Sequence, residues 1–568
     1  MNDSFIFLFF RRMRTPLVVL ISAYAIATAG FTLMPGVDDQ GNPWRLSVFE
    51  AFYVVSYTGS TIGFGEVPYP FSPAQRLWTM VSIYLTVFAW LFSIGTIISL
   101  LEDPAFRTAL RRARFRRAIR GLSQPFYLVC GYGDTGRMLV RALTAQRHPV
   151  VVLDTSQEKI DGLSVARYAA DVAPFCMDAR LPDNLIQSGL RSRWCLGVFA
   201  VTGDDRTNLK IAISAKLLNQ SCIVQARADR PSVAENMRSF DTNHVVDTVA
   251  EYVERLRLAF VKPAMFALYQ WMASGPDARI PDVGELPRGH WILCGYSRLG
   301  RAMNAMLEEI GLTVTVIEQP GRSSDLPDGA IEGPATQAET LQAAGIESAQ
   351  GIVATTADDV DNLSILVTAR DLNPDLFAAI LENGRSSHEL FRAAEPDLVG
   401  QPSTVIAGAM LARSRSPLAR PFFTRLLAED DAVGDALLQR LKGHQSDRPP
   451  TLLTVRISER RAPALARWLE HGGRITIGEL LRHPARAEES LPLEALLLRR
   501  DDKDSLLPSA DTALELGDRL LLAGRDGCSR WLESTLQNDT TLTRLVTGQA
   551  VQQGWVWRWL SNRRRAAS

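Results

Sequence analysis

Two glycine-rich stretches carry the residues whose types and spacing could do chemistry. The first, STIGFGEVPYP (residues 60–70), places Gly63 and Gly65 ahead of the carboxylate of Glu66. The second, CGYGDTGR (residues 130–137), has the glycine spacing of a phosphate-binding loop. Glycine lets the backbone approach a ligand without a side-chain clash. The first stretch therefore predicts cation contacts through carbonyl oxygens, and the second predicts anion contacts through amides.

The chain that must position these stretches has 568 residues, a length that predicts about three or four domains. Its 62 basic and 62 acidic residues balance, but residues 1–120 contain twelve arginines, no lysine and seven acids. The remainder has the mixed charge of a soluble α/β protein. We therefore expect two chemical environments.

Two uncharged segments are long enough to cross a bilayer. Residues 16–34 form a run of 19, about 28 Å as a helix, and residues 77–101 form a run of 25. A buried core helix or a signal peptide is the alternative, but the first run is longer than the apolar region of a signal peptide and no small-residue cleavage site follows it. The sequence predicts two crossings.

Arginine placement predicts the orientation of these crossings. Three arginines lie within residues 11–14 and seven within residues 107–120, whereas the loop between the spans contains only Arg45 and Arg76. By the positive-inside rule both termini are cytoplasmic. The second cluster could instead bind nucleic acid, but its position directly after a span favours topology, so we expect no nucleic-acid partner. The predicted location is the cell inner (plasma) membrane, as a multi-pass protein.

Between the spans, residues 46–60 form an apolar segment too short to cross a bilayer. It predicts a short helix that dips partway into the membrane. In TIGFG (residues 61–65), glycines alternate with larger residues, so successive carbonyls can point to one side. Four such strands around an axis give rings of oxygens that replace the water shell of an ion.

The order of span, short helix, TIGFG and span over residues 16–101 resembles the pore of a two-transmembrane potassium channel. The resemblance implies K⁺ as the permeant ion. Phe64 stands where tyrosine is commoner, losing a hydroxyl that could brace the filter, and Glu66 stands where aspartate is commoner. The implied selectivity filter is Thr61, Ile62, Gly63, Phe64 and Gly65, with Glu66 at its outer mouth.

Gly95 interrupts the second span and is a candidate gating hinge, with a close-packing role as the alternative. Neither span carries arginine at every third residue, so we expect no voltage sensor. The signal for gating must then come from the part of the chain beyond the spans.

Residues 126–154 carry a dinucleotide fingerprint in its expected context. A β-rich run leads into Gly131, Gly133 and Gly136, a helical pattern follows, and a second strand ends at Asp154, 23 residues after the first glycine. The glycines let a pyrophosphate approach a helix N-terminus, and the acid can bind a ribose. A Rossmann fold without ligand is the alternative.

The same pattern recurs 164 residues later in residues 290–318, where Gly295 and Glu318 are again 23 residues apart. Later strands also correspond, since GVFAVTGDDRTNL in the first copy matches GIVATTADDVDNL in the second. Ser297 replaces the middle glycine in the second copy. Ligand binding there stays open, with a smaller nucleotide as one option.

Residues 123–250 and 288–412 are similar to RCK domains, the TrkA-type regulators of potassium conductance. The resemblance implies NAD(H) or ADP/ATP as regulatory ligand. It implies phosphate contacts by Gly131, Tyr132, Gly133, Asp134, Thr135 and Gly136, a ribose contact by Asp154, an adenine-side contact by Asp178, and Thr202 near the far end. In the second copy Gly295, Gly300 and Glu318 match, but Pro334 takes the place of Asp178.

The predicted fold class is a membrane α-helical pore, with two transmembrane helices and a pore helix, followed by α/β Rossmann-like RCK domains in tandem and a small α+β C-terminal lobe. The C-terminal lobe resembles the lobe that accompanies RCK domains, especially in GDRLLLAG. The expected domains are the pore (1–104), a basic linker (105–122), the first Rossmann lobe (123–250), a helical crossover (251–287), the second Rossmann lobe (288–412), a linker (413–447), the C-terminal lobe (448–536) and a Trp/Arg-rich tail (537–568).

No metal site is assigned, because the six cysteines and seven histidines are scattered without ligand spacing. A divalent cation is a further candidate ligand, for which carboxylates are available. Solvation or helix capping is the alternative for these residues, which are Asp204, Asp205, Asp358 and Asp359.

The leading hypothesis is a potassium-selective channel gated by an intracellular nucleotide whose RCK domains pull on the pore-lining helices. Four chains close the filter, so we expect a homotetramer with eight RCK units in a cytoplasmic ring. A membrane-anchored NAD-dependent oxidoreductase would need a catalytic acid or base, for which no convincing histidine or lysine constellation is present. A regulatory subunit of a potassium transporter is disfavoured because such subunits lack their own pore. The chain is therefore not expected to be an enzyme.

Overall fold

The computed structural model of the chain describes residues 3–273, 279–280, 284–414, 418–444, 448–525 and 527–548. It divides into two compact units, Met1–Gly121 and Leu122–Ser568, each of which is described by itself. The tryptophans and arginines expected in the tail lie outside the described residues. They are Trp555, Trp557, Arg558, Trp559 and Arg563–Arg565.

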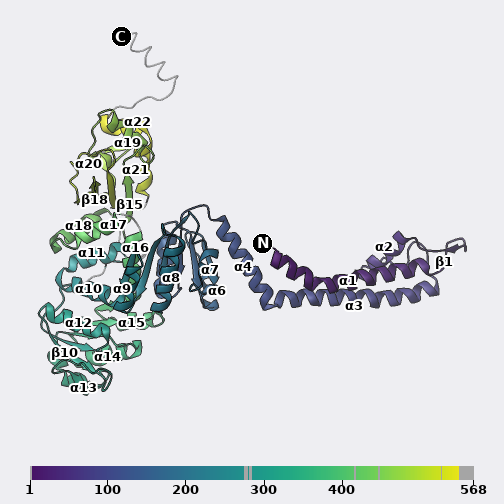
Figure 1. The fold of residues 1–568 in the computed structure, drawn as a ribbon, viewed down its shortest axis with the longest axis horizontal. Helices are drawn as coiled ribbons and strands as arrows, with labels where there is room; N and C mark the ends of the chain where they lie inside the picture. Colours follow the sequence, from purple (N-terminus) through teal and green to yellow (C-terminus); the bar gives the residue numbers. More distant parts are fainter. Residues whose placement is uncertain are drawn as a thin grey trace, which may run out of the picture. The chain divides into compact units, whose positions relative to one another are not determined.

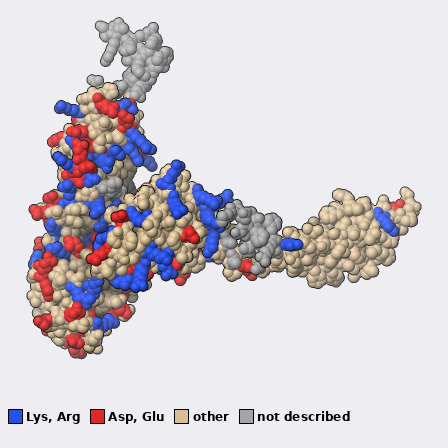
Figure 2. Space-filling view, viewed as in Figure 1, with Lys and Arg blue, Asp and Glu red and all other residues tan. Residues whose placement is uncertain are grey.

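The first unit is built on two long helices that run side by side, α1 and α3 (Figure 1). By length and composition, Met13–Leu33 and Pro73–Glu102 are apolar enough to cross a membrane, and Figure 2 shows few charged side chains on the visible face of this unit. The elements are α1 (Asp3–Leu33), β1 (Gly36–Val37), β2 (Pro43–Trp44), α2 (Val48–Gly59), α3 (Pro73–Glu102) and α4 (Pro104–Gly121).

Capping and close packing fix these helices. Ser47 begins α2 and Ser72 begins α3, each in a reciprocal capping box that satisfies free backbone amides of the first turn. At Gly30 a Cβ would lie 1.9 Å from the Trp78 ring, so glycine allows α1 to approach α3. The Trp78 indole in turn donates a 2.9 Å hydrogen bond to the carbonyl oxygen of Ala27.

The second unit contains two six-stranded parallel sheets with the same strand order, β5-β4-β3-β6-β7-β8 and β11-β10-β9-β12-β13-β14. This is the doubly wound Rossmann order, with the chain reversing beside β3 and β9. The predicted fold class is therefore confirmed.

The first sheet comprises β3 (Phe126–Cys130), β4 (Val150–Asp154), β5 (Val172–Cys176), β6 (Cys195–Ala200), β7 (Ile223–Ala228) and β8 (His244–Asp247). Its helices are α5 (Asp134–Ala145), α6 (Gln157–Val165), α7 (Pro182–Gln187), α8 (Asp205–Leu218) and α9 (Pro231–Ser239). The second sheet comprises β9 (His290–Cys294), β10 (Thr313–Glu318), β11 (Ile331–Glu332), β12 (Gly351–Ala354), β13 (Phe377–Leu381) and β14 (Leu398–Gly400). Its helices are α12 (Arg298–Glu309), α13 (Ala338–Ala343), η1 (Ile346–Ser348), α14 (Asp359–Leu372), η2 (Arg385–Ser387) and α15 (His388–Ala394).

The two Rossmann repeats exchange a helix. Helix α10 (Thr248–Val261) follows the first sheet but packs on α12 of the second repeat. Helix α16 (Pro402–Ser414) follows the second sheet but packs on α5 of the first. Tyr252 of α10 accordingly lies in one core with Trp291, and Met410 of α16 lies in one core with Leu139. Each repeat therefore completes the core of the other.

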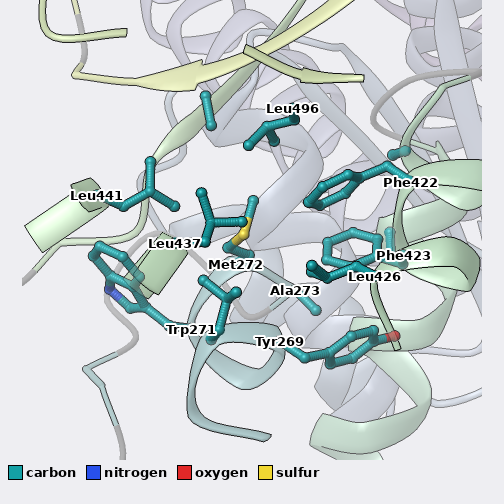
Figure 3. Close-up of a cluster of buried hydrophobic side chains, with 14 of the residues drawn as sticks. Tyr269, Trp271, Met272, Ala273, Phe422, Phe423, Leu426, Leu437, Leu441 and Leu496 are labelled. Atoms are coloured by element: carbon teal, nitrogen blue, oxygen red, sulfur yellow. The ribbon is translucent and has the colours of Figure 1, made fainter. Parts of the chain in front are cut away.

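The stretch expected as a linker, residues 413–447, is largely helical. Helices α17 (Ala419–Leu426) and α18 (Asp431–His444) join α11 (Pro263–Ala273) in one buried cluster. Figure 3 shows side chains of these three helices converging beneath a strand of the C-terminal lobe. Apolar residues at helical spacing within a charged stretch, such as Leu437 and Leu441, are the physical reason for the difference.

The C-terminal lobe contains an antiparallel sheet in the order β15-β20-β18-β19 and a hairpin of β16 and β17. It extends beyond the expected residue 536, because Leu542 of α22 is buried in its core. The strands are β15 (Thr451–Arg456), β16 (Arg482–His483), β17 (Arg486–Ser490), β18 (Leu493–Arg500), β19 (Lys503–Leu506) and β20 (Arg519–Gly524). The helices are α19 (Pro463–Glu470), α20 (Ile477–Leu480), α21 (Cys528–Gln537) and α22 (Asp539–Thr547).

Candidate functional site

The predicted filter has an alternating backbone. The angle φ is positive at every second residue, 61° at Thr61, 66° at Gly63 and 91° at Gly65. A backbone that alternates between left-handed and ordinary conformations turns successive carbonyls to the same side. Carbonyl oxygens in one row can take the place of water around a dehydrated cation.

Helix α2 supports this stretch mainly through Tyr57. The amides of Ile62 and Gly63 lie 2.9 and 3.4 Å from the carbonyl oxygen of Tyr57, which accepts both hydrogen bonds. The Phe64 ring packs edge-on against Tyr57 and stacks on Tyr53, with ring centroids 5.6 and 6.2 Å apart. Both aromatic contacts come from the same short helix, so α2 supports the filter along its length.

Glu66 does not stand free at the end of the filter. Its carboxylate accepts two hydrogen bonds from the Arg76 guanidinium, at 2.8 and 3.0 Å, and a third from the Phe71 amide at 2.8 Å. The Arg76 hydrogen bond, followed by the Phe71 amide, holds the pKa of Glu66 below its ordinary value. The carboxylate thus stays charged while it ties the loop to the first turn of α3.

Gly95 lies inside α3, which is continuous from Pro73 to Glu102. A Cβ at Gly95 would meet no atom of the described chain within 4 Å. Close packing within one chain therefore does not require this glycine, and its role as a hinge stays a prediction.

The first glycine loop is built by three glycines with different tasks. A Cβ at Gly131 would lie 2.9 Å from the backbone of Val201 and Thr202, and one at Gly136 would lie 2.0 Å from the carbonyl oxygen of Gly131. These two allow the loop to pack tightly. Gly133 is the N-cap residue of α5 and provides no side-chain cap. A Cβ at Gly133 would meet no atom within 4 Å. The open space at the amide end of α5 fits a phosphate group.

Asp154 both shapes this loop and faces the open space. Its carboxylate accepts hydrogen bonds from the amides of Tyr132, at 2.7 Å, and Ser156, at 2.8 Å. Asp178 is paired with Arg180 at 2.8 Å, and this hydrogen bond lowers the pKa of Asp178. The predicted ribose and adenine-side acids therefore lie near the ends of neighbouring strands, Asp154 as the last residue of β4 and Asp178 two residues after β5.

Seven of the nine residues predicted for the first site line one cavity of about 890 Å³, namely Gly131, Gly133, Asp134, Thr135, Asp154, Asp178 and Thr202. The other two predicted residues, Tyr132 and Gly136, are buried. The Tyr132 hydroxyl shares a 2.7 Å hydrogen bond with that of Tyr168. The two buried residues shape the loop and do not reach the cavity.

The cavity is also lined by cations and by the second repeat, which the sequence reading missed. Residues of the second repeat that line it include Ser297, Thr356, Asn383 and Ser403, and the cations are Lys159, Arg180 and Arg227. The sequence signal for the contribution of the second repeat is the duplication itself, because Thr202 and Thr356, which both line the cavity, occupy equivalent positions after β6 and β12. A ligand bound at the first glycine loop would therefore contact both repeats.

The second glycine loop keeps the same backbone. Gly295 has φ of 97°, and a Cβ at Gly300 would lie 2.0 Å from the Gly295 carbonyl oxygen. Glu318 is buried, and its carboxylate accepts hydrogen bonds from the amides of Tyr296, at 2.5 Å, and Gln319, at 2.8 Å. The cavity here is smaller, about 240 Å³. Arg301 and Arg322 line it together with Glu318 and Asp361, so this small cavity presents two cations and two carboxylates.

The carboxylates considered for a divalent cation are used within the fold. Asp204 and Asp358 accept amide hydrogen bonds as the N-caps of α8 and α14. Asp205 accepts from the Asp229 amide at 2.8 Å, and Asp359 accepts from the Asn383 amide at 2.7 Å. In the described part of the chain, no group of three or more His, Cys, Asp or Glu side chains could hold a metal ion.

Family models match both parts of the chain. An ion channel model matches residues 18–103, and a TrkA-N domain model matches twice, at residues 127–248 and 291–402. Potassium channel protein 1 of Methanocaldococcus jannaschii is 27% identical over 191 residues, which are 33% of this chain and 55% of that protein. The voltage-gated potassium channel Kch of Escherichia coli is 26% identical over 138 residues, 22% of this chain and 32% of that one. The match thus spans about half the length of the first relative and less of the second.

Solved structures that match this chain include the GsuK channel, at a TM-score of 0.49 and 17% identity over 96% of this chain and all of that one. The GsuK channel bound to NAD has a TM-score of 0.45 and 17% identity over 95% of this chain and all of that one.

The fold and the two family matches place a segment that matches an ion channel model ahead of two Rossmann-like repeats that match TrkA-N domains. The chain is in part similar to potassium channel proteins, and its two TrkA-N matches lie in tandem after the ion channel match.

Proposed function

We propose that this chain forms a potassium-selective channel whose conductance is set by an adenine nucleotide bound at the first glycine loop. The observation that carries the proposal is the alternating positive φ at Thr61, Gly63 and Gly65 in a stretch flanked by two membrane-length helices. A row of carbonyl oxygens at that place serves cation passage and has no use in a soluble enzyme.

One chain supplies one row of oxygens, so four chains are needed to surround an ion. The channel is then a homotetramer in the cell membrane, with both termini cytoplasmic, as the arginine distribution favours. Two Rossmann repeats in each chain give eight units for a cytoplasmic ring. A nucleotide changes the balance between the open and the closed pore only if it binds these two arrangements with different affinity.

The ligand is NAD(H), ADP or ATP. Gly133 leaves room for a pyrophosphate at the amide end of α5, and Asp154 offers a carboxylate to ribose hydroxyls. The cations around the cavity, which are Lys159, Arg180 and Arg227, match a phosphorylated ligand. The cavity binds nucleotide as a regulator, so we expect no turnover of NAD(H).

Ion flux through the purified full chain in liposomes tests the proposal, with nucleotides titrated on the cytoplasmic side. We expect K⁺ flux to exceed Na⁺ flux and to change with nucleotide. Two matched variants separate the parts: Gly63→Ala should abolish flux but keep nucleotide binding, and Gly133→Ala should keep flux but remove its response to nucleotide. Equal K⁺ and Na⁺ flux, or steady oxidation of NADH, would contradict the proposal.

A further inference from the structure

Two thiols of the first repeat, away from the filter and the nucleotide cavity, lie in contact. The sulfur atoms of Cys195 and Cys222 are 3.9 Å apart. Cys195 is the first residue of β6 and Cys222 directly precedes β7, the neighbouring parallel strand. The two sulfurs need to approach by less than 2 Å to reach a disulfide bond of about 2.05 Å.

The two thiols have unequal chemistry. The hydrogen bond from the Cys195 thiol lowers the pKa of Cys222, and the nearby Lys216 ammonium adds to this effect. Lys216 is held there by a 3.2 Å hydrogen bond to the carbonyl oxygen of Cys222. The same thiol–thiol contact raises the pKa of Cys195. Because the Lys216 ammonium lies beside Cys222, we take Cys222 as the nucleophile and Cys195 as the resolving thiol.

We propose that Cys195 and Cys222 are an oxidation site that small peroxides convert to a reversible disulfide. The Cys222 thiolate attacks one oxygen of hydrogen peroxide, the O–O bond breaks, and the products are a sulfenic acid and, after uptake of one proton, water. The Cys195 sulfur then attacks the Cys222 sulfur and displaces hydroxide, which takes the Cys195 proton to form a second water. Both sulfurs are oxidised by one electron each, and peroxide is reduced to two water molecules.

A small oxidant suits the site because both cysteines are buried. Access depends on the turn before Cys222, where Gln220 and Ser221 are exposed. This turn follows α8, and the opposite end of α8 brings Asp204 and Thr207 to the nucleotide cavity. A disulfide would fix the connection from α8 to β7 at the edge of the sheet that faces away from the cavity.

Peptide mapping of the full chain tests the proposal without reference to ion flux. The protein is treated with hydrogen peroxide, its remaining thiols are alkylated, and peptides are identified by mass spectrometry. We expect a cross-linked peptide pair containing Cys195 and Cys222, loss of two of the six thiols, and recovery of both on reduction with dithiothreitol.

Variants sharpen the test. Cys222→Ser should abolish the cross-link, whereas Cys195→Ser should leave a Cys222 sulfenic acid that dimedone traps. Cys176→Ser is the matched control, since this cysteine lies at the end of β5 and is partly exposed, and it should leave the cross-link intact. Wild-type protein that keeps all six thiols, or that forms only irreversible sulfinic acid at Cys222, would overturn the proposal. The wild-type map decides even where a variant fails to fold.

Discussion

The hydroxyl of Tyr57, in α2, donates a 2.6 Å hydrogen bond to the carbonyl oxygen of Gly65, the last residue of the filter stretch. The carbonyl oxygen of Tyr57 accepts from the amides of Ile62 and Gly63 near the start of that stretch. One residue of the short helix therefore binds both ends of TIGFG. Phe64 lacks the hydroxyl that a tyrosine at this position could use to brace the filter. In this structure the hydroxyl of Tyr57 makes a hydrogen bond to the filter instead.

Tyr57→Phe should weaken selectivity without loss of the fold. It removes one hydrogen bond worth about 1 kcal/mol and keeps the ring against Phe64. We expect the ratio of K⁺ to Na⁺ flux in liposomes to fall about fivefold. Tyr53→Phe is the control, because the Tyr53 ring also contacts Phe64, by stacking, and this substitution should leave the ratio unchanged. An equal effect of both substitutions would show that the hydrogen bond from the Tyr57 hydroxyl has no special role in selectivity.

Alanine at two glycines of the first loop should separate folding from binding. Gly136→Ala places a Cβ 2.0 Å from the Gly131 carbonyl oxygen, and we expect it to destabilise the repeat by about 1–3 kcal/mol. Gly133→Ala meets no protein atom and should change stability by less than about 1 kcal/mol. It should nevertheless weaken ADP binding about tenfold or more, because its methyl group occupies the phosphate space.

Calorimetry of the two variants measures both effects, through thermal unfolding and through ADP titration. Gly162→Ala serves as control, since a Cβ there also meets nothing within 4 Å and the residue lies in α6. Normal ADP affinity in Gly133→Ala would show that the ligand does not use the amide end of α5.

Ser297→Gly should open the second glycine loop. Ser297 occupies the position of Gly133 but carries a side chain at the start of α12. We expect the wild-type chain to bind one ADP and the variant to bind a second, measured as stoichiometry by titration calorimetry. Gly133→Ala in the same background should remove the first ADP and keep the second. A stoichiometry of two in the wild type would mean that Ser297 does not obstruct the loop.

Acidification should destabilise the first repeat through His244. Burial, followed by the charges of Arg413, Arg420 and Lys216, lowers the pKa of His244 from 6.5 to about 4. Between these values the unfolded chain binds a proton that the folded chain does not, so stability falls as the pH drops from about 6.5 to about 4. Because the imidazole is only half-buried, we expect a loss of about 1–2 kcal/mol.

Thermal unfolding at about pH 7.5 and about pH 5 measures this loss, since the two values bracket the unfolded-state pKa. His244→Gln should reduce the difference between the two midpoints, whereas His471→Gln, at an exposed position, should not. A pH dependence that survives His244→Gln would have to come from other groups.

Much of the fold could be predicted because its signals are local. The glycine spacing and the acid 23 residues later identify each Rossmann repeat, and the observed strand order is the one typical of that fold. The sequence favours a linker at residues 413–447 because charged residues there hide the apolar residues at helical spacing, and the structure has helices α17 and α18 in this stretch. The ion pair between Glu66 and Arg76 could not be predicted either, since the sequence marks Arg76 only as a charge beside a membrane span.

By itself, the sequence determined the features that depend on short segments of the chain. They are two membrane-length apolar runs, a stretch whose glycines accept positive φ, and a duplicated nucleotide fingerprint. Hydropathy and backbone sterics act over a few residues, so they can be read from the chain directly. The tertiary structure alone decided that α10 and α16 exchange repeats, that Ser297 and Thr356 line the cavity of Asp154, and that Cys195 touches Cys222. The first two relationships arise because the two repeats bury their apolar faces against each other, and the third arises because β6 and β7 pair within the first sheet.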